Sequence, residues 1–200
     1  MAGDWNHNTH FHPLLLRLVP RGGAAALDIG SGDGRFAALL AHRFVEVSAL
    51  DPDPAQVAAS SDRCRGLSNV TVRQATLLES GLPDEHFDVV TALASFHHMP
   101  FPDAAAEAPR VLKPGGRLVV LGVWTDNESK VDLALNVISV ALNKFLQARR
   151  GPDAMTAPAT LERTRWRDVR RQAATYLPGS RLCRRPLWRY TMVWDKPRVA

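Results

Sequence analysis

Three glycines alternate with other residues in the segment Gly30-Ser31-Gly32-Asp33-Gly34. An apolar run, residues 24–29, precedes them, and residues 35–44 carry apolar side chains at helical spacing. This pattern predicts a buried strand, a tight loop and a helix. Glycine permits positive φ angles and a close approach of backbone to a ligand, and the start of a helix presents unpaired N–H groups. The segment therefore predicts a ligand-binding loop at the end of a strand.

An acidic residue follows the next predicted strand. Residues 45–50 have the side-chain pattern of a strand, and Asp51 comes directly after them, 19 residues beyond Gly32. A carboxylate at this place can accept hydrogen bonds from both hydroxyls of a ribose. The alternative is that the glycines form a plain turn and that Asp51 caps the segment after it. The combination of strand, glycine loop, helix and acid favours a nucleoside site.

Strands and helices alternate along the first 125 residues. Strands are predicted at residues 24–29, 45–50, 70–73, 87–93 and 117–123, and helices at 12–19, 35–43, 55–65 and 103–112. This alternation predicts right-handed crossovers and a parallel sheet. Two further helices are predicted at residues 129–150 and 163–176, followed by an antiparallel strand pair at 181–184 and 187–194.

The expected fold class is therefore α/β. We predict a doubly wound, Rossmann-like, seven-stranded sheet, mostly parallel with an antiparallel C-terminal strand pair. A chain of 200 residues fits a single domain. Within residues 1–200 we expect an N-terminal lid and helix (1–23), a cofactor-binding core (24–123), and roof helices with closing strands (124–200).

The identity of the nucleoside is narrowed by the loop itself. The dinucleotide fingerprint G-x-G-x-x-G fails here, because Arg35 occupies the place of its last glycine. Gly30-x-Gly32-x-Gly34 instead resembles the first motif of class I S-adenosylmethionine-dependent methyltransferases. Residues 82–90 resemble that family's approach to its fourth strand, and residues 110–120, with Lys113-Pro114-Gly115-Gly116, resemble its helix-turn-strand motif. The resemblance covers residues 24–123 and is closest to the small-molecule branch that includes quinone-biosynthesis enzymes.

The resemblance implies S-adenosyl-L-methionine as cofactor and suggests which residues contact it. Asp28 and the loop from Gly30 through Ser31 and Gly32 to Gly34 would lie near its methionine moiety, and Asp51 would bind the ribose. The remaining implied contacts are Pro52 beside the adenine, Ala75 and Thr76 at the adenine edge, and Ala94 and Ser95 near the transferred methyl group. This chain lacks the acid that many members place near residue 75, so Gln74 or a backbone carbonyl would take its role.

Histidines at two places are candidate general bases, because imidazole titrates near neutral pH. His97 and His98 follow the fourth strand, at the sheet edge where ligands of such folds bind. Adjacent side chains diverge, so one of the two is expected to face the pocket. The alternative is a histidine that only hydrogen-bonds its own loop.

The second group lies in residues 4–12, Asp4-Trp5-Asn6-His7-Asn8-Thr9-His10-Phe11-His12. In similar enzymes this segment folds over the cofactor site. Trp5 and Phe11 would then cover the ligand, while His7 or His10 reaches the acceptor. The alternative is a frayed terminus. Zinc binding by three of these histidines is disfavoured because no cysteine or carboxylate partner is evident, so no metal is expected.

Residues 133–146 carry Asn136, Ser139 and Asn143 at spacings of three and four, a polar stripe on an apolar helix. Such a helix could roof an apolar acceptor pocket with a few hydrogen-bonding groups. The alternative is a packing helix whose polar stripe faces water.

Composition and charge limit the partners. No secretory signal and no membrane span are expected, since the longest apolar stretch is interrupted by polar residues, and two widely spaced cysteines fit the cytoplasm. Residues 101–200 carry 18 Lys and Arg against 9 Asp and Glu, so an RNA or protein methyltransferase is the alternative to a small-molecule enzyme. No nucleic-acid-binding module is visible, so a small-molecule substrate, methylated on oxygen in secondary or quinone-like metabolism, is favoured. A cofactor-binding regulatory protein is a third reading. The sequence indicates no oligomeric state.

Overall fold

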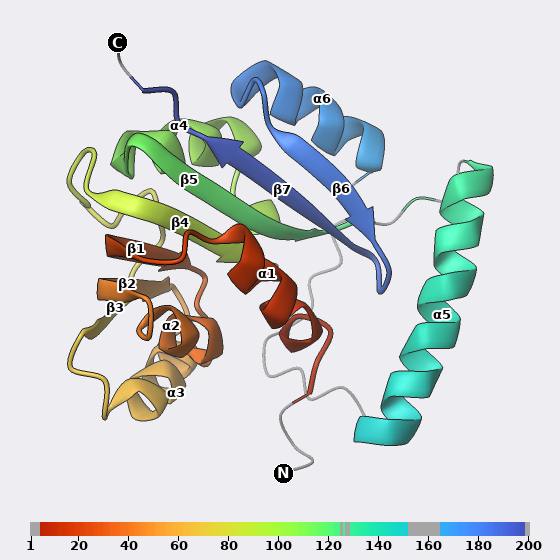
Figure 1. Ribbon diagram of the computed structural model, residues 1–200, viewed down its shortest axis with the longest axis horizontal. Coiled ribbons are helices and arrows are strands. Elements are labelled where there is room, and N and C mark those ends of the chain that lie inside the picture. The colour runs from red at the N-terminus through yellow and green to blue at the C-terminus, as the bar shows by residue number, and fades with distance from the viewer. Residues whose placement is uncertain (1–4, 125, 127–128, 152–164, 199–200) are drawn as a thin grey trace.

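The computed structural model describes residues 5–124, 126, 129–151 and 165–198. These residues form one seven-stranded sheet in the order β3-β2-β1-β4-β5-β7-β6 (Figure 1). The strands are β1 (Gly23–Ile29), β2 (Phe44–Asp51), β3 (Val70–Gln74), β4 (Phe87–Leu93), β5 (Leu112–Val123), β6 (Arg181–Arg185) and β7 (Arg189–Asp195). The first five are parallel, and β7 is antiparallel to both β5 and β6. The predicted mostly parallel sheet with an antiparallel end is confirmed.

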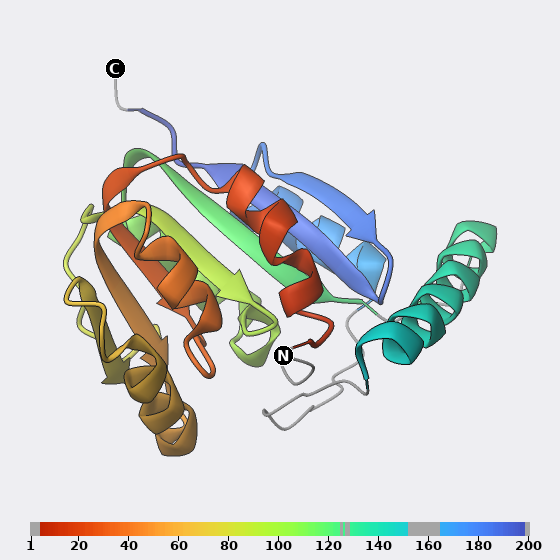
Figure 2. The same ribbon diagram turned by 60° about the horizontal axis from the view of Figure 1, so that its bottom comes forward.

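Helices cover both faces of the sheet. They are α1 (His12–Leu18), α2 (Arg35–Leu40), α3 (Pro54–Cys64), α4 (Phe101–Val111), α5 (Lys130–Arg150) and α6 (Trp166–Tyr176), with short 3-10 turns η1 (Thr9–Phe11) and η2 (Phe96–His98). The core forms two clusters: α4 and α6 contribute to one, and α1 and α2 to the other (Figure 2). In β1, Leu27 belongs to the first cluster and Ala26 to the second, which is why this strand reads as a continuous apolar run.

The sheet reverses its winding between β1 and β4. From β1 the chain proceeds outward through β2 to β3 and then returns to β4, beside β1. In such sheets ligands bind outside the carboxyl ends of the strands at this point. The glycine loop follows β1, and Ala94 and Ser95 follow β4. The topology therefore brings the two predicted cofactor segments together.

The segment Lys113-Pro114-Gly115-Gly116 differs from the prediction. It was expected as a separate turn, but the structure includes it in β5, which begins at Leu112. The segment after β7 supplies the missing partners: Gly115 N–H donates to the Lys196 carbonyl (2.9 Å), and Lys196 N–H donates to that of Gly116 (2.8 Å). The segment still bulges within β5, since Gly115 has a φ angle of 80° and the pairing with β4 passes from Phe87–Leu112 to Val89–Arg117. The hydrogen bonds to Lys196 hold this bulge in place, and its role is structural.

Helix α5 lies beside the sheet, next to the β6–β7 end (Figures 1 and 2). It starts with a capping box, in which Ser129 and Asp132 each bind the other's backbone N–H group. By length and composition alone, α5 is the one described helix that could cross a membrane, which is weak evidence by itself.

The polar stripe of α5 faces the protein, not water. Asn136 accepts a hydrogen bond from Trp188 Nε1 (3.0 Å), and Ser139 Oγ accepts one from Leu187 N–H (2.9 Å). Neither expected arrangement of this helix is found. Its residues line no part of the main cavity, and its polar groups are turned inward because the β6–β7 turn offers them hydrogen-bond donors.

Candidate active site

The loop between β1 and α2 has the backbone that its glycines predict. Gly30, Gly32 and Gly34 have positive φ angles of 62°, 54° and 77°. A Cβ atom at Gly30 would lie 2.3 Å from Ser95 Cβ, and one at Gly34 would lie 2.4 Å from Ser60 Oγ. A Cβ at Gly32 would have a single neighbouring atom within 4 Å, at 3.7 Å. Packing therefore requires glycine at two of these positions, whereas Gly32 leaves open space beside the loop.

Asp51 connects the end of β2 to this loop. Its Oδ2 accepts a hydrogen bond from Gly32 N–H (2.8 Å), and its Oδ1 accepts one from Asp53 N–H (3.0 Å). The residue is only 7% exposed. Each carboxylate oxygen has a second lone pair, so the group can still accept two hydroxyl donors. The carboxylate holds the loop in place and keeps capacity for a ligand.

Asp28, in β1, is a second buried acid in the same site. It is 1% exposed, and Thr91 Oγ1 donates to its Oδ1 at 2.6 Å. Burial raises the pKa of Asp28 to about 7, and the nearby Asp51 charge adds to the increase, against the opposing effect of the Thr91 hydrogen bond. A cation placed beside this carboxyl group would stabilise its charged form.

One cavity of about 420 Å³ lies at the carboxyl ends of β1, β2 and β4. Ten of the eleven residues predicted to contact the cofactor line it: Asp28, Gly30, Ser31, Gly32, Asp51, Pro52, Ala75, Thr76, Ala94 and Ser95. The eleventh, Gly34, packs against α3 instead. Within the described part of the chain, Ser31 Oγ is buried without a hydrogen-bond partner. This unpaired hydroxyl and the open space at Gly32 fit a polar ligand held against the loop.

The chain bends sharply where β4 ends. Ala94 has a φ angle of 55°, which is unusual for a residue with a side chain. Its N–H donates to the Leu121 carbonyl (2.7 Å), and Ser95 Oγ donates to the Ile29 carbonyl (2.5 Å). These bonds hold the strained residue beside the cavity. Such strain is found at functional sites.

The N-terminal segment lies over the cavity, with its polar side chains facing it. Asn6, Asn8 and Thr9 line the cavity. Asn6 Oδ1 accepts from the N–H groups of Asn8 (2.9 Å) and Thr9 (2.7 Å), which fixes a local turn. Asn8 Oδ1 in turn accepts from Arg189 Nε (3.1 Å) on β7. Residues 1–4, including Asp4, lie outside the described part of the chain.

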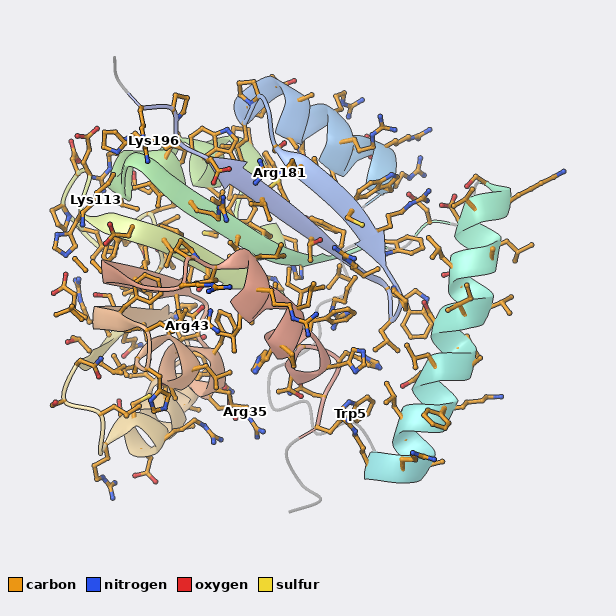
Figure 3. All side chains as sticks on the ribbon, in the orientation of Figure 1. Trp5, Arg35, Arg43, Lys113, Arg181 and Lys196 are labelled. Carbon is orange, nitrogen blue, oxygen red and sulfur yellow. The ribbon has the colours of Figure 1, made fainter. Side chains whose placement is uncertain are left out.

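The aromatic residues of this segment do not cover the ligand site as expected. Trp5 and Phe11 are buried in the core cluster beside α1, at 6% and 5% exposure (Figure 3 labels Trp5). Large apolar rings gain more from burial in the core than from lining a polar cavity. The cover is therefore built from asparagine and threonine.

A comparison with protein families is decisive for residues 27–120, which match the model of the methyltransferase domain. These residues contain the glycine loop, Asp51 and the end of β4. This part of the chain, just under half of its length, is similar to a methyltransferase domain. A solved structure of similar fold is that of an S-adenosylmethionine-dependent methyltransferase.

Curated relatives of the methyltransferase domain include three informative proteins. An uncharacterised methyltransferase of Mycobacterium tuberculosis is 35% identical over 124 residues, which cover 60% of this chain and 61% of that protein. The 27-O-demethylrifamycin SV methyltransferase of Amycolatopsis mediterranei is 39% identical, covering 56% and 43% of the two chains. A ubiquinone/menaquinone biosynthesis C-methyltransferase of Shewanella oneidensis is 34% identical, covering 50% and 43%. The similarity thus spans less than two thirds of each relative.

A solved structure extends the likeness in fold beyond the methyltransferase domain. The S-adenosylmethionine-dependent methyltransferase of Aquifex aeolicus superposes with a TM-score of 0.65 at 18% identity. The superposition covers 95% of this chain and 94% of that one. The flanking elements of this chain therefore follow the same overall fold.

Of the four histidines predicted as bases, the cavity includes His98. His97 stacks on it, with ring centroids 4.1 Å apart, but does not line the cavity. Burial is the main reason that the pKa of His97 is lowered to about 4, with His98 and Arg189 adding to the decrease. One of the two, His98, lines the cavity as expected, but the two rings lie together and do not diverge.

His7 and His10 lie outside the cavity lining. His7 Nε2 is hydrogen-bonded to Asn143 Oδ1 on α5 (3.0 Å), and its ring meets the Trp5 and Trp188 rings edge-on. His10 stacks edge-on against Phe11, and burial lowers its pKa. His7 thus connects the N-terminal segment to α5, whereas His10 packs within the segment.

His12 lines the cavity and was not predicted as a base. It is the first residue of α1, and its ring packs against Phe36 at 5.1 Å. Burial, together with the nearby Arg35 charge, lowers its pKa to about 4, so it is neutral near pH 7. Its position after a helix-starting turn was the only sequence signal.

Among the described residues, no group of three His, Cys, Asp or Glu side chains could hold a metal ion.

Proposed function

We propose that this protein transfers the methyl group of S-adenosylmethionine to a small-molecule acceptor. The observation that carries the proposal is the 420 Å³ cavity, in which the glycine loop and Asp51 meet the side chains after β4 and the N-terminal cover. The finer proposal is transfer to an oxygen atom of a secondary metabolite or a quinone-like molecule. It is supported by the rifamycin methyltransferase and the quinone-biosynthesis enzyme among the relatives.

The bound cofactor supplies a sulfonium whose methyl group is already activated, so that the acceptor–carbon bond forms as the carbon–sulfur bond breaks. In this proposal Asp51 accepts the ribose hydroxyls, and Asp28 faces the ammonium of the methionine moiety. The loop from Gly30 to Gly34 approaches the ligand with its backbone. Asn6, Asn8 and Thr9 exclude water from above.

In this proposal His98 receives the acceptor's proton, which is supported by its position in the cavity lining after β4. The part of the cavity near it also contains Met99 and Leu93, which suits an acceptor with apolar surface. We therefore propose one domain over residues 1–200, in which residues 1–23 carry the cover and residues 24–123 hold the cofactor.

Seven of the eighteen basic residues in 101–200 form ion pairs within the described part of the chain. Arg117 and Arg181 both pair with Asp195, at 2.6 and 3.0 Å, and Arg184 pairs with Asp132. Arginines neutralised within the chain contribute less to phosphate binding. This pairing favours a small acceptor over RNA.

Titration calorimetry tests the proposed function. We expect S-adenosylmethionine and S-adenosylhomocysteine to bind with micromolar affinity and NAD to give no signal. Transfer of a labelled methyl group to members of a panel of phenols and hydroxylated metabolites is then expected. Reduced turnover of His98→Asn with unchanged cofactor affinity would support His98 as the general base. Absence of cofactor binding would refute the proposal. Binding without transfer would favour a regulatory protein, and labelling of tRNA would favour the alternative substrate class.

The raised pKa of Asp28 predicts a pH dependence of cofactor binding. The free carboxyl group is mostly protonated at pH 6, while the cofactor's ammonium favours the carboxylate, so binding releases a proton. With a pKa of about 7 in the free protein, affinity is expected to rise about eightfold from pH 6 to pH 7.5. Calorimetry in buffers of different ionisation enthalpy measures both the affinity and the proton release.

Asp28→Asn is the matched variant, because it keeps the shape of the neutral carboxyl group. Its affinity is expected to be low and nearly constant over the same pH range. A wild-type affinity that does not change with pH would show that Asp28 does not face the ammonium.

The same raised pKa predicts that the free wild-type protein loses stability as the pH rises from about 4 to 7, since the folded state binds the extra proton.

A further inference from the structure

Helix α5 presents an apolar surface to its surroundings. Among the described residues, nine large apolar side chains are exposed, and six of them lie on this one helix: Val131, Leu133, Val137, Ile138, Val140 and Phe145. Figure 3 shows side chains of α5 projecting away from the sheet. The other three, Val45, Leu78 and Tyr176, lie on separate segments. A continuous apolar row of this kind marks an interaction surface.

The orientation of the helix is fixed by its polar stripe. Asn136, Ser139 and Asn143 are hydrogen-bonded to the protein or pack toward it, and Asp132 is paired with Arg184. Turning the apolar row inward would break each of these bonds and leave buried polar groups unpaired. The apolar row therefore faces outward because the polar stripe is needed inside.

The charges on the exposed side of α5 are all positive. Lys130, Arg149 and Arg150 are exposed at its two ends and Lys144 next to Phe145, and the only acid in the helix, Asp132, is buried in its ion pair. Arg149 also lies over the Phe145 ring, 4.8 Å from its centroid. The surface thus combines an apolar row with cations at both ends and no exposed carboxylate.

We propose that the outer face of α5 docks the protein onto an anionic lipid bilayer. The apolar row would enter the boundary between head groups and acyl chains, and the terminal cations would contact lipid phosphates. Lysine and arginine stems can extend from an apolar face to the head-group level. The helix lies along the surface and does not span the bilayer, because its other side is bonded to the protein.

A second copy of the chain fits this face less well. Packing two α5 helices together, in parallel or antiparallel, places Lys130, Lys144 and the terminal arginines near other cations. Neither copy offers an exposed α5 carboxylate to pair with them, and like charges across an interface oppose association. Anionic lipid supplies the missing negative charge.

The docking surface is also connected to the proposed site. Asn143, on the inner side of α5, is hydrogen-bonded to His7, which neighbours the cavity-lining residues Asn6 and Asn8. A bilayer under α5 would therefore lie next to the segment that covers the cavity. The proposal itself concerns the surface and does not depend on catalysis.

Vesicle flotation of the full chain tests the docking surface. Vesicles of phosphatidylcholine with 30% phosphatidylglycerol are compared with phosphatidylcholine alone, at about 0.15 M salt. We expect the protein to float with the anionic vesicles, to remain unbound with the neutral ones, and to lose most of its binding in high salt.

The variant Val137→Glu with Ile138→Glu alters two exposed positions in the middle of the row, and we expect it to bind at least tenfold less. Val45→Glu makes the same change on an exposed residue of β2 and is expected to bind like the wild type. Circular dichroism and thermal melting verify that both variants fold.

The proposal would be overturned by wild-type protein that does not float with the anionic vesicles. It would also be overturned by a double variant that binds these vesicles as well as the wild type does. A wild-type dimer that the double variant converts to a monomer, measured by sedimentation without lipid, would assign the face to self-association instead.

Discussion

Asp51→Asn is expected to weaken S-adenosylmethionine binding by about ten- to a hundredfold, as measured by calorimetry. In the proposed complex the Asp51 carboxylate accepts two ribose hydroxyls while it also accepts from Gly32 N–H and Asp53 N–H. Asparagine retains one oxygen acceptor and turns an NH₂ group toward one of these donors. Both the charge and part of the acceptor capacity are lost.

Asp62→Asn is the matched control, since it makes the same change on the exposed side of α3 and is expected to leave binding unaltered. An Asp51→Asn protein that binds the cofactor normally, but melts at a lower temperature, would favour the other interpretation of this acid. Asp51 would then cap the turn after β2 and hold the glycine loop, without contacting the ribose.

The sheet and the cofactor-binding segments were predictable because their signals are local. Residues 25–29 of the predicted strand are buried, and the glycines that follow it all adopt positive φ angles. Parallel-sheet topology then brings the ends of β1, β2 and β4 together without further sequence information. A local pattern combined with a general rule of topology was enough to assemble ten of the predicted contact residues around one cavity.

The orientation of α5 was not predictable, because a helical period shows that two faces differ but not which one meets the protein. The orientation of α5 is determined by hydrogen bonds to groups far away in the sequence: Trp188 Nε1, Leu187 N–H and His7. The same limit applies to the N-terminal segment. Trp5 and its neighbours alternate in polarity, and the structure buries the aromatic rings and leaves the asparagines at the cavity.

Gly30→Ala is expected to lower the thermal stability of the protein more than Gly32→Ala does. The residue needs a φ angle of 62°, which disfavours alanine by about 1–2 kcal/mol. The new Cβ would lie 2.3 Å from Ser95 Cβ, and relieving such overpacking costs roughly a further 1–3 kcal/mol. For a chain of this size these terms correspond to a melting temperature lowered by about 5 °C or more.

The two contributions are separable with a second substitution. Ser95→Gly removes the atom that the new Cβ would meet, so Gly30→Ala combined with Ser95→Gly is expected to melt above the value that additive effects give. Gly32→Ala serves as the contrast, because its Cβ would have one neighbour, at 3.7 Å, and would stand in the open space of the cavity. We expect that variant to lose only the backbone contribution of about 1–2 kcal/mol, because Gly32 has a φ angle of 54°, and to bind S-adenosylmethionine poorly. Equal melting temperatures for Gly30→Ala and Gly32→Ala would contradict the packing difference between these two glycines. Stability at Gly30 and ligand access at Gly32 are thus distinct requirements on neighbouring residues of one loop.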